Sequence, residues 1–456
     1  MGLFGTSGIR GVVNAELTPE LALEVGMALS SLRGPGTYLL GRDARTTGPL
    51  IGMAFSSGVM ACGGDVLDVG LVPTGALAFL TKELGAKAGC IITASHNPPE
   101  YNGLKLFRPD SAPLWPEEQK EIEEAVRGRS FRRATWTSVG EYERSEEASR
   151  YVEALSSLLE PRRRWRVVLD PGCGSASHLA PEVFRAIGCD VIALNARPDG
   201  YFPARNPDPR PETVSELCQM VKAVEADVGF AYDGDADRMV VVDETGSFVP
   251  FDVALAAFAA YVVRSRGGGL VVTTVEASRC VEEAVEEAGG RVEKTRVGDV
   301  YVSVEVVRKG AVFGGEPCGA WVIPDVHLCA DGILASLALL GALDEEGLTP
   351  SEFFRPIPRF YTIRKKAPCP NELKGDVMAL LREELPSSFE RIKALIDIDG
   401  LRLELEDAWV LVRPSGTEPV VRVTAEARET EKAEEVASRA LELVRRAVEE
   451  AGRKRH

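Results

Sequence analysis

The sequence predicts an α/β protein with three tandem related α/β domains containing mixed β-sheets, followed by a smaller C-terminal α+β domain, around a central cleft. Three observations favour this fold class. The chain has 456 residues, which is too many for one hydrophobic core. A pattern of apolar strand, polar loop, helix and apolar strand occurs three times. Near the C-terminus a different pattern replaces it.

The repeated pattern is read from pairs of short apolar runs. Residues 37–41 and 65–69 form the first pair, residues 166–170 and 190–194 the second, and residues 269–274 and 291–293 the third. Continuous apolar strands that alternate with amphipathic helices are typical of β–α–β units, in which helices cover both faces of a sheet. Before the first pair, Thr18 and Pro19 predict the start of a helix, with Thr18 as its cap.

The C-terminal part follows another order. Strands are expected at residues 401–405, 408–412 and 420–425, and a charged helix at about 431–450. Residues 356–370 are interpreted as the connection to this last domain. The expected domains are therefore 1–150, 151–250, 251–365 and 366–456.

Composition limits the partners. A net charge of −16 argues against nucleic acid or an anionic membrane surface as the main partner. No apolar run is long enough to span a bilayer. Nine scattered cysteines without a CxxC pair fit reduced thiols in the cytoplasm. We expect a cytoplasmic protein that acts on a small molecule; the sequence leaves open whether it is a monomer or a homo-oligomer.

The segment Thr93-Ala94-Ser95-His96-Asn97-Pro98 follows a short apolar strand. Polar residues at a strand end, stopped by two prolines, indicate an exposed loop that presents a hydroxyl group to a ligand. His96 adjoins Ser95, and Lys105 follows within reach of a loop that folds back. The alternative interpretation is a capped turn with an incidental serine.

Three carboxylates at a spacing of two residues, Asp233, Asp235 and Asp237, would repel one another unless a cation lies between them. Hard oxygen ligands of this kind suit Mg²⁺. An EF-hand loop is excluded because Arg238 occupies the position that needs glycine, and residues 239–242 continue as a strand. A solvated acidic turn without metal is the other alternative.

Three further loops also carry residues that could bind a substrate. Residues 413–417 combine an arginine, two hydroxyls and a glycine, a combination that favours phosphate binding. Glu316, in a glycine-rich turn, is placed to accept hydrogen bonds from sugar hydroxyls, and Arg10 lies in a glycine-rich segment near the N-terminus. Each could instead be an ordinary turn. Taken together with Ser95 and the carboxylates, they indicate phosphoryl transfer on a phosphorylated sugar.

These motifs resemble those of the α-D-phosphohexomutase family, in the same order along the chain. Residues 93–98 are similar to its phosphoserine loop, and residues 233–238 to its metal loop. Residues 315–319 resemble its sugar loop, residues 413–417 its phosphate loop, and residues 8–11 its N-terminal arginine segment.

The resemblance implies a mechanism. A phosphoserine at Ser95 would donate its phosphoryl group to a hexose monophosphate. The resulting bisphosphate would reverse its orientation in the site and transfer its other phosphoryl group back to Ser95. Mg²⁺ would be held by Asp233, Asp235, Asp237 and phosphorylated Ser95, with hexose 1,6-bisphosphate as activator. The implied catalytic residues are Ser95, His96, Lys105 and Arg10. The implied substrate contacts are Arg238, Asp299, Glu316, Cys318, Arg413, Ser415, Gly416 and Thr417.

Two departures bear on the sugar. Members that act on glucose and mannose phosphates usually have Ser-Gly-His in the sugar loop, where this chain has Cys318-Gly319-Ala320, so a histidine proposed as general base is absent. The segment Val297-Gly298-Asp299 is similar to phosphoglucosamine mutases, and the acid at 299 could pair with a 2-ammonium group. Glucosamine phosphate is therefore the favoured substrate. Glucose or mannose phosphate, a sugar-phosphate phosphatase and a non-catalytic phosphosugar-binding protein are the alternatives.

Overall fold

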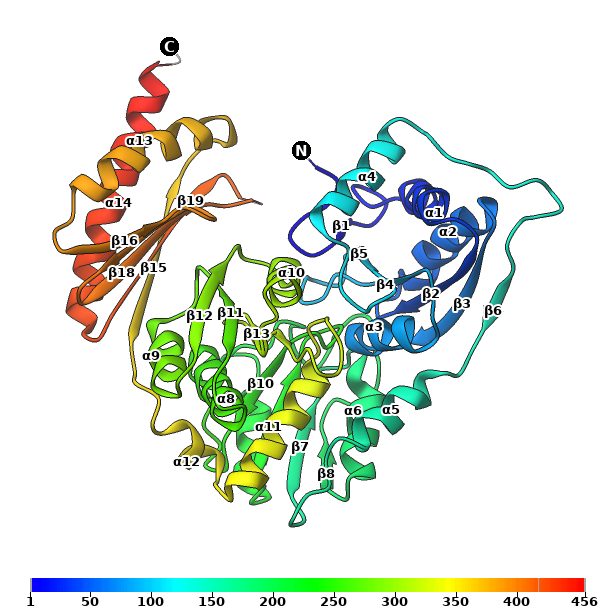
Figure 1. Ribbon diagram of the computed structural model, residues 1–456, viewed down its shortest axis with the longest axis horizontal. Helices are drawn as coiled ribbons and strands as arrows, with labels where there is room; N and C mark the ends of the chain where they lie inside the picture. The colour runs from blue at the N-terminus through cyan, green and yellow to red at the C-terminus, as the bar shows by residue number, and fades with distance from the viewer. Residues whose placement is uncertain (1, 417, 455–456) are drawn as a thin grey trace.

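The computed structural model describes residues 2–416 and 418–454, so Thr417 lies outside the described residues. The chain forms four β-sheets in succession. In Figure 1 the four domains are arranged in an arc, with the first and the fourth at its two ends. Three tandem α/β domains with mixed sheets and a C-terminal α+β domain are thus confirmed.

The first sheet has six strands in the order β1-β5-β4-β2-β3-β6. The strands β2, β3, β4 and β6 run parallel, and β5 is antiparallel to both β4 and β1. Thr18 caps the first helix, as expected, because its side chain accepts a hydrogen bond from the Leu21 N–H. The elements of this domain are β1 Ile9–Val12, α1 Pro19–Arg33, β2 Gly36–Arg42, α2 Gly48–Ala61, β3 Gly64–Leu71, α3 Thr74–Glu83, β4 Ala88–Ile92, β5 Tyr101–Phe107, α4 Pro116–Arg127 and β6 Tyr142–Arg144.

The second and third sheets each have four strands, in the orders β10-β9-β7-β8 and β12-β11-β13-β14. The apolar runs at 166–170, 190–194, 269–274 and 291–293 are present as the strands β7, β8, β11 and β12. The second domain contains α5 Ala148–Ser156, β7 Arg166–Asp170, α6 Ala176–Ala186, β8 Asp190–Ala193, α7 Ser215–Ala223, β9 Val228–Tyr232 and β10 Met239–Val242. The third contains α8 Phe251–Ser265, β11 Leu270–Thr274, α9 Arg279–Glu287, β12 Arg291–Thr295, α10 Asp299–Lys309, β13 Phe313–Gly315, β14 Trp321–Val322, α11 Gly332–Glu346 and α12 Pro350–Phe354.

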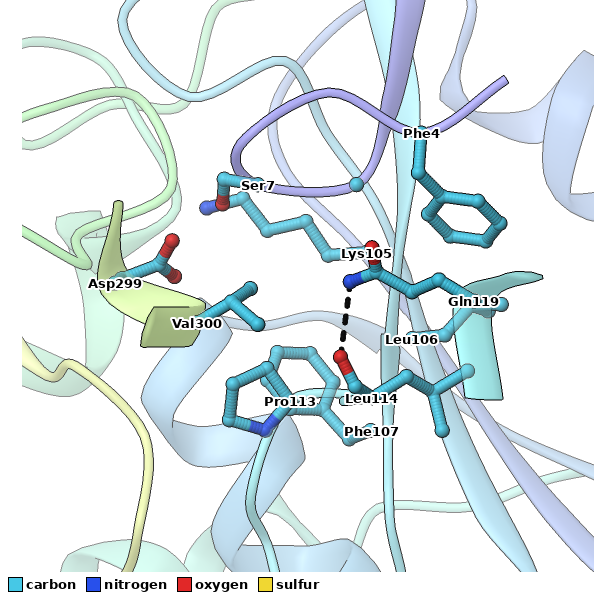
Figure 2. A pocket seen from close by; sticks show the side chains of 11 residues that line it. Phe4, Ser7, Lys105, Leu106, Phe107, Pro113, Leu114, Gln119, Asp299 and Val300 are labelled. Atoms are coloured by element: carbon cyan, nitrogen blue, oxygen red, sulfur yellow. Dashed lines mark hydrogen bonds between the residues drawn. The ribbon is translucent and has the colours of Figure 1, made fainter. Parts of the chain in front are cut away.

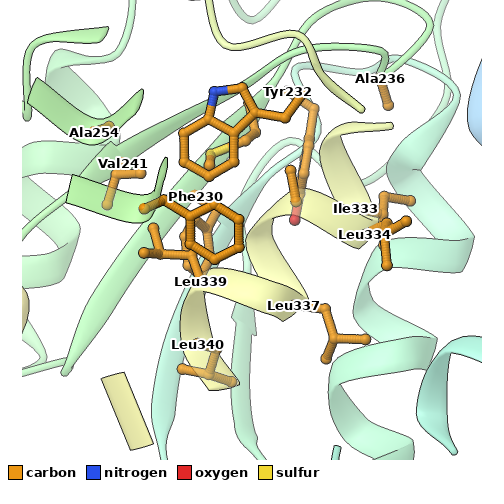
Figure 3. Close-up of a cluster of buried hydrophobic side chains, with 14 of the residues drawn as sticks. Phe230, Tyr232, Ala236, Val241, Ala254, Ile333, Leu334, Leu337, Leu339 and Leu340 are labelled. Carbon is orange, nitrogen blue, oxygen red and sulfur yellow. The ribbon is translucent and has the colours of Figure 1, made fainter. Parts of the chain in front are cut away.

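A single hydrophobic cluster runs through the first three domains. It contains α3 and strand residues of the first sheet, one face of the second sheet, and helices α8, α9 and α11 of the third domain. Figure 3 shows Leu339 of α11 beside Phe230 of β9, with Ile333 and Leu337 on the other side of the helix; all four belong to this cluster. Because this apolar cluster is continuous across the domain boundaries, the first three domains hold one another in position.

The fourth domain has an antiparallel sheet in the order β15-β19-β18-β17-β16 and a separate core. Its elements are β15 Tyr361–Pro368, η1 Asn371–Leu373, α13 Lys374–Ser387, β16 Ile392–Ile396, β17 Leu401–Leu405, β18 Ala408–Pro414, β19 Val420–Ala427 and α14 Thr430–Lys454. Strand β15 lies inside residues 356–370, which were expected to be only a connection. It crosses the expected boundary between residues 365 and 366, just as α5 crosses the one between 150 and 151. Its solvent-exposed, charged sequence carries no apolar alternation.

Polar contacts attach the fourth domain to the third. The fully buried Arg402 donates to the carbonyl oxygens of Val275 and Ala277 at 2.6 and 2.8 Å. Arg279 and Lys294 of the third domain both pair with Glu404, at 2.9 Å. Within residues 2–416 and 418–454, no helix combines the length and apolar character that crossing a membrane requires.

Candidate active site

Ser95 lies at the end of β4 and is fully buried. Its hydroxyl donates to Asp233 Oδ2 at 2.6 Å and lies 3.2 Å from His96 Nδ1. Asp233 follows β9 of the second domain and stands 138 positions further along the chain. The structure therefore brings the serine loop and the acidic loop together as one site.

The acidic loop connects β9 to the antiparallel strand β10. Its carboxylates, Asp233, Asp235 and Asp237, are buried and offer oxygens that lie within 4.8 Å of one another. Asp235 Oδ2 accepts hydrogen bonds from Lys105 Nζ and from the Thr74 hydroxyl, both at 2.7 Å. Lys105 also pairs with Asp237 Oδ2.

The same loop has unmet hydrogen-bonding capacity. The Oδ1 atoms of Asp235 and Asp237 are buried and have no hydrogen-bond partner among the described residues. Buried oxygens without donors are costly unless a cation or another polar group satisfies them. Three closely spaced carboxylates with free oxygens fit a hard divalent cation such as Mg²⁺, which binds oxygen ligands.

The charges of the site are mutually dependent. Burial raises the pKa of Asp233 well above its ordinary value, and Asp237 and Asp235 add repulsion. Burial would also raise the pKa of Asp235, but the neighbouring Lys105 outweighs it and holds that pKa below its usual range. Burial would lower the pKa of Lys105, yet the two carboxylates it pairs with raise it. The Lys105 ammonium and the Arg238 guanidinium, which lies 3.8 Å from Asp237, offset only part of the charge of three carboxylates, and a divalent cation would neutralise the rest.

Arg10 and His96 lie beside the serine. Arg10 is on β1, which pairs with β5, and its guanidinium donates to Asn97 Oδ1 at 3.2 Å. Burial lowers the pKa of His96 to about 2, with the cations Arg238 and Arg10 adding to the effect. His96 is therefore a neutral imidazole at physiological pH, and its Nδ1 faces the adjacent hydroxyl.

The sugar-loop candidate is the turn between β13 and β14. Glu316 is buried, and its Oε2 accepts a hydrogen bond from the Gly298 N–H at 2.9 Å. Burial raises the pKa of Glu316 to about 8, and Asp299 adds repulsion. Gly319 has a φ of +88°, and a Cβ there would lie 2.0 Å from the Met239 carbonyl oxygen. This glycine therefore lets the turn rest directly against β10, next to the acidic loop.

Asp299 begins α10, immediately after Gly298, and is half-buried. It lines one pocket together with Ser7 and Lys105, as Figure 2 shows. Burial raises the pKa of Asp299, and the field of Lys105 partly opposes this. Cys318 is half-buried, and burial raises the pKa of its thiol, so it is not a thiolate at neutral pH.

The phosphate-loop candidate lies on another domain, between β18 and β19. Arg413 pairs with Glu276 at 3.1 Å and with Asp399 at 2.9 Å. Ser415 is buried and its hydroxyl accepts from the Glu418 N–H at 3.1 Å, while Gly416 is exposed. In Figure 1 this loop extends from the fourth sheet toward the middle of the arc.

Three residues with direct contacts to these loops were not singled out from the sequence. Thr74 binds Asp235, and Lys374 Nζ donates to the carbonyl oxygens of Ser415 and Glu418 at 2.5 and 2.6 Å. The third is Arg45, whose contacts are described below. The position of Arg45 in a polar loop directly after a predicted strand could have marked it as a candidate. Thr74 and Lys374 stand in no local sequence pattern that would have done so.

Comparison with known proteins agrees with this geometry. Four family descriptions match in order: Phosphoglucomutase/phosphomannomutase, alpha/beta/alpha domain I at residues 1–133, domain II at 149–246, domain III at 250–360, and the C-terminal domain at 368–443. Proteins named probable phosphoglucosamine mutase from Pyrococcus abyssi and Methanopyrus kandleri are each 44% identical to this chain. The alignments cover 98% of this chain and 99% and 98% of the relatives.

Solved structures lead to the same class. A phosphoglucomutase/phosphomannomutase family protein from Burkholderia thailandensis is 30% identical with a TM-score of 0.87, covering 99% of this chain and 97% of its own. A putative phosphomannomutase from Thermus thermophilus is 27% identical with a TM-score of 0.81, covering 97% of this chain and 98% of its own. The chain is thus a phosphohexomutase, an isomerase that moves a phosphoryl group between two positions of a hexose. It belongs to the phosphoglucomutase/phosphomannomutase family.

Proposed function

We propose that Ser95 carries the transferred phosphoryl group and that the enzyme interconverts glucosamine 6-phosphate and glucosamine 1-phosphate. The observation that carries the first part is the 2.6 Å hydrogen bond from the Ser95 hydroxyl to Asp233, within the cluster of acidic oxygens. A hydroxyl held against a potential metal site is where a phosphoserine would place its oxygens beside a cation.

Mg²⁺ would be held by Asp233, Asp235 and Asp237, with an oxygen of phosphorylated Ser95 as a further ligand. When bound, it supplies positive charge that offsets the charge of the transferring phosphoryl group. The chain's own residues supply the rest. Lys105 holds the carboxylates in place by pairing with two of them, and Arg10 points its guanidinium at the serine loop.

Proton movement is assigned to His96 rather than to Lys105. Phosphoryl transfer from Ser95 leaves its oxygen in need of a proton, and transfer back releases one. The neutral His96 Nδ1 lies 3.2 Å from Ser95 Oγ, within reach of that proton. Lys105 Nζ instead donates to Asp235 and Asp237, and these carboxylates raise its pKa, so it stays an ammonium suited to electrostatic stabilisation.

The second part of the proposal concerns the substrate. Relatives of 44% identity over nearly the full chain are named probable phosphoglucosamine mutase. Two buried carboxyl groups lie near the proposed sugar position: burial raises the pKa of both Asp299 and Glu316, Asp237 adds repulsion at Asp299, and Asp299 adds repulsion at Glu316. A 2-ammonium group would relieve this repulsion, which a 2-hydroxyl cannot do. Arg238 and Cys318 would complete the contacts to the sugar.

The other end of the sugar would be held by Arg413, Ser415, Gly416 and Thr417. Because the bisphosphate has to present each end in turn, this loop needs to recognise a phosphate and little else. Hexose 1,6-bisphosphate would act as activator by phosphorylating Ser95 in enzyme molecules that have lost the group.

The test is a kinetic comparison of glucosamine, glucose and mannose 6-phosphates, with Mg²⁺ and a hexose 1,6-bisphosphate. We expect kcat/KM to be highest for glucosamine phosphate, and Asp299→Asn to reduce that preference. Equal values for all three sugars contradict the substrate assignment. Release of inorganic phosphate at a rate matching isomer formation would indicate a phosphatase.

Ser95→Ala tests the first part. It should abolish turnover and prevent the gain of one phosphate in the intact mass after incubation with the bisphosphate. Ser57→Ala is the control, because the Ser57 hydroxyl is exposed on α2 and donates only to the Met53 carbonyl. A phosphorylated or active Ser95→Ala enzyme refutes the assignment, and a wild-type enzyme that never gains phosphate indicates a non-catalytic binding protein.

A further inference from the structure

Arg45 is fully buried in the loop between β2 and α2, and its guanidinium is surrounded by main-chain carbonyl oxygens. One terminal nitrogen donates to the carbonyls of Ser95 at 2.8 Å and Asn97 at 2.6 Å. The other donates to those of Pro98 at 2.5 Å and Tyr101 at 2.8 Å. All these acceptors belong to the segment that carries Ser95, so one side chain binds the whole serine loop from inside.

The loop needs such support because Ser95 has a φ of +52°, in the left-handed region that a residue with a Cβ rarely occupies. Its N–H donates to the Thr93 hydroxyl at 2.9 Å, and that hydroxyl donates to Asp43 Oδ2 at 2.7 Å. Asp43 in turn pairs with Arg45 at 3.0 Å. Both the N–H and the C=O of Ser95 are therefore tied to one buried ion pair.

The second domain closes over this ion pair. The Phe202 ring centroid lies 5.2 Å from the Arg45 guanidinium carbon, in a cation–π arrangement. Gly234 of the acidic loop packs against the same serine, where a Cβ would lie 2.5 Å from the Ser95 carbonyl oxygen. The carbonyl that Arg45 holds is thus also a packing surface for the acidic loop, which couples its position to that of Asp233.

We propose that Arg45 is a positioning residue for phosphoryl transfer: it sets the conformation in which the Ser95 hydroxyl faces the acidic loop. This inference rests on the proposed role of Ser95 as the phosphoryl carrier. Lysine cannot replace it, because a single ammonium has no planar fork and too few donors for four carbonyls and a carboxylate.

The first experiment compares Arg45→Lys with the wild type in a single turnover. Enzyme phosphorylated on Ser95 is mixed with saturating hexose 6-phosphate and Mg²⁺, and the loss of phosphoserine is followed by quenched-flow mass spectrometry. Misplacement of a reacting group by about 1 Å costs on the order of 100-fold in rate, and we expect a fall of that size. KM should change little, since Arg45 does not touch substrate.

Arg402→Lys is the matched control. Arg402 is equally buried and also donates to main-chain carbonyls, but at the junction of the third and fourth domains. Both variants should melt at lower temperature than the wild type, whereas only Arg45→Lys should transfer the phosphoryl group slowly. A single-turnover rate for Arg45→Lys within threefold of wild type, or an equal loss in Arg402→Lys, overturns the inference.

A second pair of variants separates positioning from folding. Arg45→Met leaves the buried Asp43 carboxylate unpaired, whereas Asp43→Asn/Arg45→Met removes both charges. The double variant should regain melting temperature relative to Arg45→Met but not its transfer rate. Recovery of both together would make the role of Arg45 merely structural. If instead the wild-type phosphate sits on a residue other than Ser95, the proposed function itself fails.

Discussion

The Thr74 hydroxyl supports a testable prediction about metal binding. Thr74 begins α3 in the first domain, and its hydroxyl donates to Asp235 Oδ2 at 2.7 Å while its N–H donates to the Asp235 carbonyl at 2.9 Å. Thr74→Val removes the hydroxyl donor and keeps both the shape of the side chain and the main-chain bond. With that donor gone, Asp235 is free to rotate its unpartnered Oδ1 away from the metal position.

The expected size follows from the remaining contacts. Asp235 Oδ2 keeps Lys105 as a donor at 2.7 Å, so the carboxylate loses one of two side-chain partners and not both. Loss of an outer partner of a metal ligand typically weakens metal binding by about 10- to 100-fold. That range equals about 1.4 to 2.8 kcal/mol, which agrees with the roughly 1.5–3 kcal/mol of a hydrogen bond to a charged group.

The assay is a Mg²⁺ titration of turnover at saturating substrate. Thr74→Val should need about 10 to 100 times more Mg²⁺ for half-maximal rate, with the maximal rate approached at high Mg²⁺. Thr81→Val is the control: Thr81 is buried in the same helix, and its hydroxyl donates to the Leu77 carbonyl at 2.8 Å. An unchanged Mg²⁺ requirement in Thr74→Val, or an equal shift in Thr81→Val, refutes the reasoning.

Three other outcomes are expected. Lys105→Met and Lys294→Met each remove a lysine that bridges two carboxylates, so each should lower the free energy of unfolding by about 3 kcal/mol. Only Lys105→Met should lose turnover, and only this variant should regain stability when Mg²⁺ is added. Gly319→Ala places a Cβ 2.0 Å from a β10 carbonyl and should lower kcat/KM, whereas Gly347→Ala, with φ +66° and open space around it, should cost only about 1 kcal/mol of stability. Burial raises the pKa of Asp252 to about 7, so its contribution to stability is present below about pH 4 and is lost as the pH rises through 7. Asp252→Asn should therefore raise the free energy of unfolding at pH 8, by more than about 1 kcal/mol, and change it much less at pH 4.5. Equal Mg²⁺ rescue of both lysine variants, unchanged kinetics of Gly319→Ala, or a pH-independent effect of Asp252→Asn would contradict the respective argument.

The sequence was most informative where strands are buried on both faces. The apolar runs of β2, β7 and β11 are continuous because helices cover both sides of those sheets, and the same runs located the loops at their ends. Two exposed edge strands were not predicted. β6 and β16 lie at sheet edges with largely exposed residues: β6 is polar and only three residues long, and β16 has apolar residues but was not predicted.

The site shows a similar division. Ser95 and the three aspartates stand in compact linear motifs, so residue type and spacing singled them out as candidates, and the structure brings them together. Thr74 stands 161 positions from the carboxylate it binds, and Arg45 stands 50 positions from Ser95. Contacts of this kind arise from how domains pack, and a single sequence does not specify which buried threonine or arginine will face which loop.

The two ends of the proposed substrate site are built with different rigidity. The serine, acidic and sugar loops all rise from domains that share one continuous hydrophobic cluster, and Gly234 and Gly319 let them touch main chain to main chain. The candidate phosphate loop belongs to a domain with its own core, attached through arginine, lysine and glutamate contacts and a small apolar cluster of Val275, Trp409 and Leu411. An interface that is small and largely polar permits relative movement more readily than a shared apolar core does. A rigid candidate reacting centre opposite a separately attached candidate phosphate loop suits the proposed reaction, in which one bisphosphate is held in two opposite orientations.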